Sequence, residues 1–208
     1  NQQLLNDVYL IDTQSGGRQQ ILQAQHGSFR LSPMGHHVWW WDGARRAWFV
    51  QDVNTDTAVD VSAAIGQRMD RELHDQPALP GPYGAAGWLQ EDAGLILYDA
   101  HDLWLVDPRE PNSPRCLTEQ VGRDRQLQFR LVDVDPSEAL DPDGRLLLSA
   151  LDMDTKEAGF WEDEIRSTEP PLKLWMDAAR TTRPVKADSA EVLLMRTGSF
   201  RTFNDLWI

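Results

Sequence analysis

The stretch Asp102-Leu103-Trp104-Leu105-Val106-Asp107 shows the local pattern that decides the fold. It is a short apolar run with an aromatic residue inside it and an acidic residue at its end. Similar runs occur at 7–12, 47–52, 159–163 and 205–208. Short runs of this kind, bounded by turn residues, favour β-strands. The closing residues Asp12, Asp52 and Asp107 are 40 and 55 positions apart, a spacing close to that of four-stranded propeller blades.

Two further elements recur around these aromatic runs. A tight turn and an apolar strand precede three of them, with the turns at 32–35, 91–94 and 141–144. Proline at the second place of a turn presets φ, and glycine at the fourth tolerates the closing geometry. A polar break and one more short strand follow each aromatic run. The repeating order therefore predicts antiparallel units of four strands.

We expect an all-β chain that forms a β-propeller fragment of four-stranded antiparallel blades, three of them whole and two partial. The predicted blades are 1–24 (partial), 25–61, 83–118, 128–174 and 182–208 (partial). Closed propellers have about four to eight blades, so 1–208 is expected to be a single partial propeller cut from a larger protein. The alternative is that the two partial blades pair with each other and close a small ring. A β-sandwich also has many short strands, but it has no reason to repeat this order.

Composition excludes several classes of protein. The formal net charge of -13, without a basic tract, argues against nucleic acid as a partner. No stretch approaches the roughly 20 apolar residues of a membrane span. Cys116 is the only cysteine, so neither an intrachain disulfide nor a cysteine-based zinc site is expected. The compartment stays undecided, with a periplasmic or secreted location favoured over a cytoplasmic one.

Several segments have a combination of residues that is typical of one family. They are Leu31-Ser32-Pro33-Met34-Gly35, Trp39-Trp40-Trp41-Asp42-Gly43, His74-Asp75 and Gly81-Pro82-Tyr83-Gly84-Ala85-Ala86-Gly87-Trp88, continued by Asp102-Leu103-Trp104 and Phe203-Asn204-Asp205-Leu206-Trp207-Ile208. Together they resemble the β-propeller of bacterial prolyl oligopeptidase-family serine peptidases, which are dipeptidyl peptidase-like enzymes. The resemblance extends over most of the chain.

This resemblance implies a propeller that caps an α/β-hydrolase domain and restricts which peptides reach the catalytic Ser, Asp and His. The sequence contains no Gly-x-Ser-x-Gly element, so the hydrolase domain is expected to be absent from these residues and none of them is predicted to be catalytic. The expected function is a non-catalytic cap that gates and positions peptide substrates, with the peptide and the hydrolase domain as partners. The alternative is a free-standing propeller that acts as a protein-binding scaffold.

The connectors between blades, at 62–82, 118–128 and 175–183, are the predicted place of function. Loops longer than about 12 to 15 residues are often functional, and the first connector exceeds that length. Its candidate binding residues are His74, Asp75 and Tyr83. In the second connector, Arg123 and Arg125 have guanidinium groups that suit a peptide carboxylate or an acidic partner surface. The alternative for all five is a solvated or locally paired loop residue.

No metal site and no cofactor are predicted. The pair His36 and His37 does not suggest a metal, because adjacent residues of a strand point to opposite faces. The uncovered edges of a partial propeller predict self-association.

Overall fold

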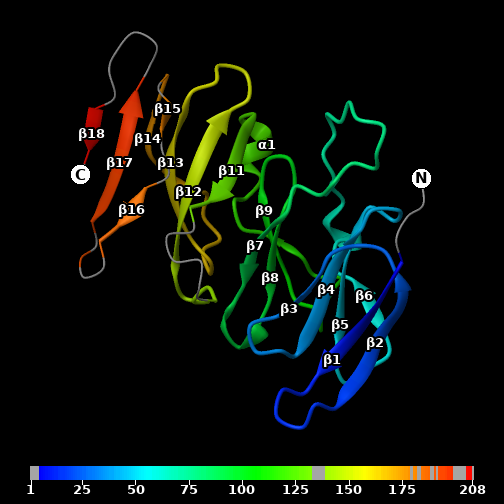
Figure 1. Cartoon of the computed structure of the whole chain (residues 1–208). Helices are drawn as coiled ribbons and strands as arrows, with labels where there is room; N and C mark the ends of the chain where they lie inside the picture. Colours follow the sequence, from blue (N-terminus) through cyan, green and yellow to red (C-terminus); the bar gives the residue numbers. More distant parts are fainter. Residues whose placement is uncertain are drawn as a thin grey trace. The chain divides into compact units, whose positions relative to one another are not determined.

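The computed structural model describes residues 5–132, 139–178, 180–181, 184–187, 190, 192–198 and 205–207. Its strands form one two-stranded hairpin and four sheets of four strands each (Figure 1). Within the described residues the helical segments are short: η1 (Ala63–Ile65), η2 (Gln90–Asp92) and α1 (Val121–Asp124). The all-β class is therefore confirmed, and its successive antiparallel sheets are those of propeller blades. None of the described helices is long and apolar enough to cross a membrane.

The chain divides into two compact units, Asn1–Asp99 with Leu105–Arg115, and Ala100–Trp104 with Cys116–Ile208. The first unit begins with the hairpin of β1 (Asn6–Ile11) and β2 (Arg18–Gln25). The next sheet has its strands in chain order: β3 (Phe29–Leu31), β4 (His37–Asp42), β5 (Ala47–Asp52) and β6 (Ala58–Asp60). The third sheet contains residues of both units: β7 (Ala85–Trp88), β8 (Leu95–Tyr98), β9 (Leu103–Val106) and β10 (Arg115–Cys116).

The second unit continues with a sheet that again follows chain order: β11 (Leu127–Leu131), β12 (Arg145–Asp152), β13 (Ala158–Glu164) and β14 (Leu172–Asp177). Its core includes Phe129 and Trp161, whose rings meet edge to face at 5.3 Å. The last sheet has the order β15 (Arg180–Thr181), β17 (Leu193–Gly198), β16 (Val185–Lys186), and β18 (Asp205–Trp207) pairs with β17. Part of the predicted last blade, 182–208, lies outside the described residues.

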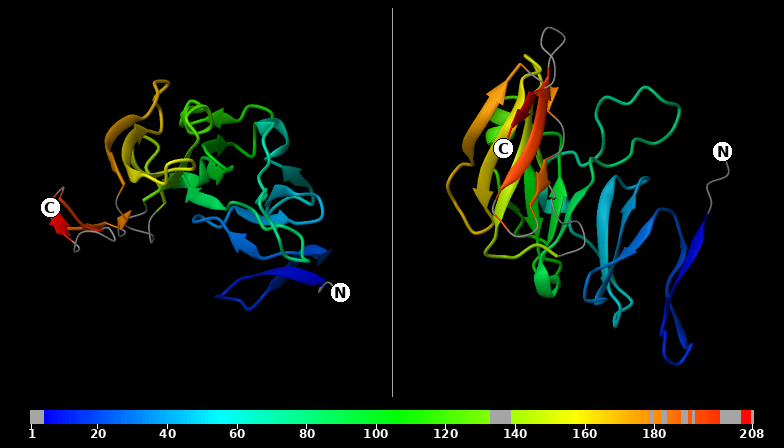
Figure 2. Two further views of the ribbon diagram at one scale, coloured as in Figure 1. Left: turned by 90° about the horizontal axis from the view of Figure 1, so that it is seen from above. Right: turned by 60° about the vertical axis from the view of Figure 1, so that its left-hand side comes forward.

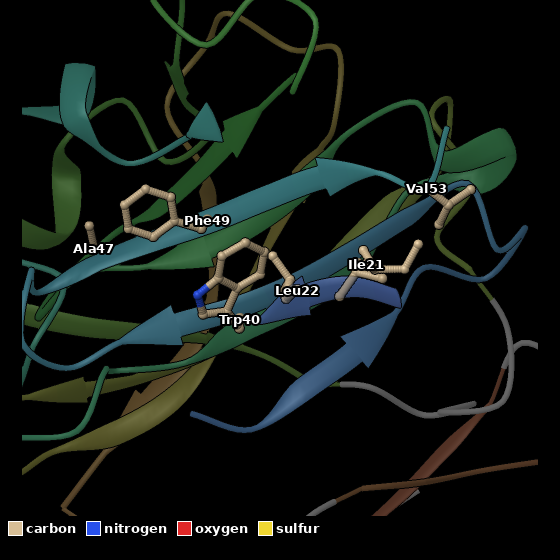
Figure 3. Close-up of a cluster of buried hydrophobic side chains, with 7 residues drawn as sticks. Ile21, Leu22, Trp40, Ala47, Phe49 and Val53 are labelled. Atoms are coloured by element: carbon tan, nitrogen blue, oxygen red, sulfur yellow. The ribbon is translucent and has the colours of Figure 1, made fainter. Parts of the chain in front are cut away.

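The tryptophans of β4 pack on both faces of their sheet. Trp40 stacks on Phe49 at 5.6 Å and belongs to a buried cluster with Ile21 and Leu22 of the β1–β2 hairpin (Figure 3). Because successive strand residues face opposite sides, Trp39 contacts other partners, Trp48 at 5.4 Å and Trp88 at 6.4 Å between ring centroids. The run 39–41 therefore joins neighbouring sheets of the first unit.

Acidic residues end the aromatic strands for a local reason. The carboxylates of Asp12, Asp52 and Asp107 each accept a hydrogen bond from the backbone N–H two residues later. Aspartate side chains stabilise turns in this way, because they replace a backbone carbonyl as acceptor.

Two of the three predicted turns are confirmed, and the third is displaced. Gly35 N donates to Ser32 O, and Gly144 N donates to Asp141 O, both at 2.9 Å. The turn expected at 91–94 instead closes one residue earlier, where Ala93 N donates to Gln90 O at 3.1 Å. Asp92 takes a left-handed φ of 52° there. Its buried carboxylate accepts hydrogen bonds from Ser32 Oγ at 2.6 Å and Met34 N at 3.1 Å, contacts that the predicted turn did not include.

The hydrogen bonds reveal a repeat that recurs from sheet to sheet. Trp48 N donates to Ser62 Oγ at 2.9 Å, and Val61 N donates to Trp48 O at 3.0 Å. In the next sheet, Leu103 N donates to Thr118 Oγ1 at 3.3 Å, and Leu117 N donates to Leu103 O at 2.8 Å. A hydroxyl that follows the fourth strand thus extends the pairing of the third strand in both sheets.

Candidate functional site

The connector between β6 and β7 leaves the sheets of the first unit as a long loop (Figure 2). Its two arms pair at the base as an irregular hairpin: Asp70 forms a β-bridge with Pro82, and Arg71 N donates to Gly81 O at 2.9 Å. The tip is exposed, and Leu73 there is 94% accessible to solvent. The connector therefore combines a fixed base with a projecting tip.

A buried carboxylate organises this base. Asp70 is 1% exposed and accepts two hydrogen bonds of 3.0 Å from Arg68, through Nε and Nη2. Arg46, which comes from the β4–β5 turn, places its Nε 3.7 Å from the same carboxylate. The bidentate hydrogen bonds from Arg68 hold the pKa of Asp70 below its ordinary value of 3.8. Two guanidinium groups face this one buried carboxylate, and the charge of Glu72 also acts on Arg68.

A pocket of about 310 Å³ lies between the β4–β5 turn and the connector. It is lined by His26, Gly27, Trp41, Gly43, Ala44, Leu79, Pro80 and Gly81. A Cβ on Gly27 would lie 2.8 Å from Trp41 O, and Gly27 also has a φ of 127°, so glycine is required there. The small residues bring backbone close to the Trp41 ring and leave the pocket open.

Trp41, which lines the pocket, is one of four tryptophans with a buried, unpaired indole nitrogen among the described residues; the others are Trp39, Trp48 and Trp88. The indole Nε1 of Trp41 is buried and has no hydrogen-bond partner among the described residues. A Cβ on Gly43 would lie 3.7 Å from this nitrogen and 3.8 Å from Leu79 Cδ1. A methyl group at position 43 would therefore be in ordinary contact with both side chains.

Two of the three predicted residues of the first connector, His74 and Tyr83, make hydrogen bonds within the connector itself. His74 Nε2 lies 2.8 Å from Ala78 O, a contact that closes the tip. The hydroxyl of Tyr83 accepts a hydrogen bond of 3.2 Å from Glu72 N across the hairpin. Asp75 is exposed and makes no hydrogen bond or ion pair to another described residue. The role of these three residues in binding stays a prediction.

The other two predicted residues belong to the second unit and lie at α1. Arg123 N donates to Asp102 Oδ2 at 3.1 Å, and the Arg125 guanidinium lies 5.7 Å from the centre of the Trp161 ring. Asp102 is completely buried and also accepts from Thr118 Oγ1 at 2.7 Å and Gly122 N at 2.9 Å. The backbone of Arg123 is thereby fixed, and the ring orients Arg125. Their binding role is likewise a prediction.

Cys116 does not have the environment of a reactive nucleophile. The thiol is half-buried, and burial raises its pKa to about 11. Catalytic cysteines instead have lowered pKa values, because the thiolate is the reactive form.

Sequence reasoning missed the cluster of Asp70, Arg46 and Arg68 and the pocket beside it. The spacing of Arg68 and Asp70 is visible in the sequence, but such pairs are common on surfaces. What singles this pair out is the burial of Asp70 and the approach of Arg46 from a turn 24 residues away.

Comparisons with known proteins do not assign this chain to a family. No protein-family model matches the chain, and no curated protein matches its sequence. A solved structure from a study of two prolyl endopeptidases aligns with 99% of this chain, at 12% sequence identity and a TM-score of 0.24. The alignment includes 44% of that chain, so the present chain spans less than half of its length. These values do not establish a shared activity.

Proposed function

We propose that the chain is the non-catalytic propeller of a prolyl oligopeptidase-like serine peptidase, in which it gates and positions peptide substrates for a hydrolase domain. The observation that supports this most is the succession of four-stranded antiparallel sheets, which contains the motifs of the family resemblance. The turn at 32–35 joins β3 to β4, the tryptophan run lies in β4, and the segment 81–88 ends in β7.

The chemistry of the described residues suits a binding role. The sequence has no Gly-x-Ser-x-Gly element, and its one cysteine has a raised pKa. The connectors instead present arginines and apolar surface, the groups that recognise the carboxylates and side chains of peptides. In this proposal the chain selects peptides and the hydrolase domain cleaves them.

A serine-reactive fluorophosphonate probe tests the proposal. The full-length protein that contains this chain should be labelled and should cleave short peptides, whereas the 208-residue chain alone should show neither reaction. Labelling of the isolated chain, or a full-length protein without peptidase activity, contradicts the proposal. The second result favours a free-standing protein-binding propeller.

Steady-state kinetics of the full-length enzyme separate positioning from catalysis. Arg125→Gln should raise KM several-fold for a peptide with a free carboxylate and leave kcat unchanged, because a binding contact is lost outside the catalytic centre. Arg166→Gln is the matched control, since this exposed arginine pairs with Asp143 at 2.8 Å. Equal KM values for the two variants would remove Arg125 from the proposed site.

A further inference from the structure

We infer that the pocket at Trp41 binds a peptide segment in which an apolar side chain lies next to a carboxylate. The inference rests on the proposed function and specifies the class of peptide. It is carried by two observations: the apolar walls of the pocket and the exposed guanidinium group of Arg46 in the turn that lines it.

The walls select an apolar side chain. Leu79 and Pro80 come from the connector and face the Trp41 ring and the small residues of the β4–β5 turn. Leu79 is 49% exposed, so part of its apolar surface remains in water. An aliphatic or proline side chain removes such surface from water when it enters, which is the usual source of affinity in pockets of this size.

The charge selects a carboxylate. The chain has a net charge of -13, yet Arg46 and Arg68 both face Asp70 at the base of the connector. The side chain of Arg46 is 54% exposed and contacts Asp70 through an ion pair of 3.7 Å at Nε, so its terminal nitrogens can meet a further carboxylate. Arg46 follows the pocket residues Gly43 and Ala44 in the same turn. A carboxylate of the bound peptide fits these terminal nitrogens.

Calorimetric titration of the 208-residue chain with three peptides tests the inference and the source of the carboxylate. The probes are N-acetyl-Ala-Leu with a free carboxylate, its C-terminal amide, and N-acetyl-Glu-Leu-amide. We expect the free acid to bind and the Ala-Leu amide to bind roughly tenfold more weakly, because a charge-assisted contact is lost. If the Glu-Leu amide binds as tightly as the Ala-Leu free acid, a side-chain carboxylate is sufficient. If the Glu-Leu amide binds more weakly than the free acid, the site recognises the C-terminal carboxylate.

Substitutions in and away from the pocket test whether the peptides bind there. Ala44→Phe fills the pocket and should abolish binding, whereas Ala64→Phe adds the same ring at an exposed position of η1 and should not. Arg46→Gln should remove the preference for the free acid over the amide, and Arg166→Gln should keep it. Thermal melts of each variant verify that it folds.

The outcomes separate this inference from the proposed function. Failure of all three peptides to bind, or binding that Ala44→Phe leaves unchanged in a folded variant, overturns the pocket inference even if the full-length protein is an active peptidase. Binding that follows the variants, in a full-length protein without peptidase activity, overturns the cap proposal and leaves the pocket as a peptide-binding site.

Discussion

Asp70 combines almost complete burial with two guanidinium partners that are about half exposed. A buried carboxylate is stable only if hydrogen bonds and charge replace the water it has lost. Arg68 supplies both hydrogen bonds, and Arg46 adds charge from the neighbouring turn. The base of the connector therefore depends on this one ionised side chain.

Asp70→Asn should lower the free energy of unfolding by about 1 to 2 kcal/mol at neutral pH, a loss limited by the exposure of its arginine partners. Because the folded state lowers the pKa of Asp70, the ionised group stabilises the fold above its ordinary pKa of 3.8. This stabilisation is lost as the pH falls below 3.8 and through the lower pKa that Asp70 has in the folded state. In urea unfolding, the difference in free energy of unfolding between wild type and variant should therefore become smaller from neutral pH to pH 3.

Asp143→Asn is the control for this measurement. Asp143 pairs with Arg166 at 2.8 Å, but both side chains are largely exposed, so its loss should cost less than about 0.5 kcal/mol. Equal losses for the two aspartates, or a difference that does not change with pH, would show that Asp70 does not stabilise the connector as an ion.

At the scale of elements, buried aspartates and close glycines fix the loops between strands. Asp102 accepts three hydrogen bonds from the segment 118–123, and the α1 backbone approaches it closely at Gly122. A Cβ on Gly122 would lie 2.6 Å from Asp102 Oδ1 and 2.8 Å from His101 O. The second connector therefore owes its conformation to a glycine and a carboxylate 20 residues apart.

Gly122→Ala should destabilise the second unit by about 2 kcal/mol or more, because the methyl group displaces a backbone oxygen and breaks a buried hydrogen-bond network. The control is Gly81→Ala, where an added Cβ meets no atom within 4 Å, and we expect little change or a slight gain. Thermal and urea unfolding of both variants compare the two sites. If Gly122→Ala leaves the free energy of unfolding unchanged, the loop accommodates the methyl group without loss of stability.

At the scale of the whole molecule, we propose that sheet edges lead to self-association. In the described part of the chain, β14 is the outer strand of its sheet. It carries Leu172, which is 65% exposed, and Leu174, which is 50% exposed. An edge with unpaired backbone groups and apolar side chains is a template for pairing with another chain.

We predict that the weight-average mass of the 208-residue chain rises with concentration in sedimentation equilibrium. Leu174→Lys should reduce this rise, since a charge on an edge strand opposes pairing. Leu73→Ser is the control, because Leu73 is exposed on a loop and not on a strand edge. A monodisperse monomer at all concentrations rules out the proposed edge contact, and an effect of Leu73→Ser alone assigns association to the connector.

Much of the architecture was readable from the sequence because its causes are local. Aromatic runs such as 102–107 form strands through propensity, and aspartates such as Asp52 end them by bonding their own backbone. Of the expected turns, only 91–94 was displaced, since a contact with Ser32, 60 residues away, decides the conformation of Asp92. Local patterns do not contain contacts of that kind.

The candidate site was only partly predictable. Sequence reasoning selected the long connector and its residues His74 and Tyr83, and these residues hold the connector together. The pocket at Trp41 and the charges around Asp70 were decided by the tertiary structure. They arise where the connector meets the β4–β5 turn, and burial there turns an ordinary aspartate into the centre of a charged cluster. The sequence alone thus determined the strands and their repeating order, because propensity and turn chemistry act over a few residues. Only folding could bring distant groups together and remove them from water.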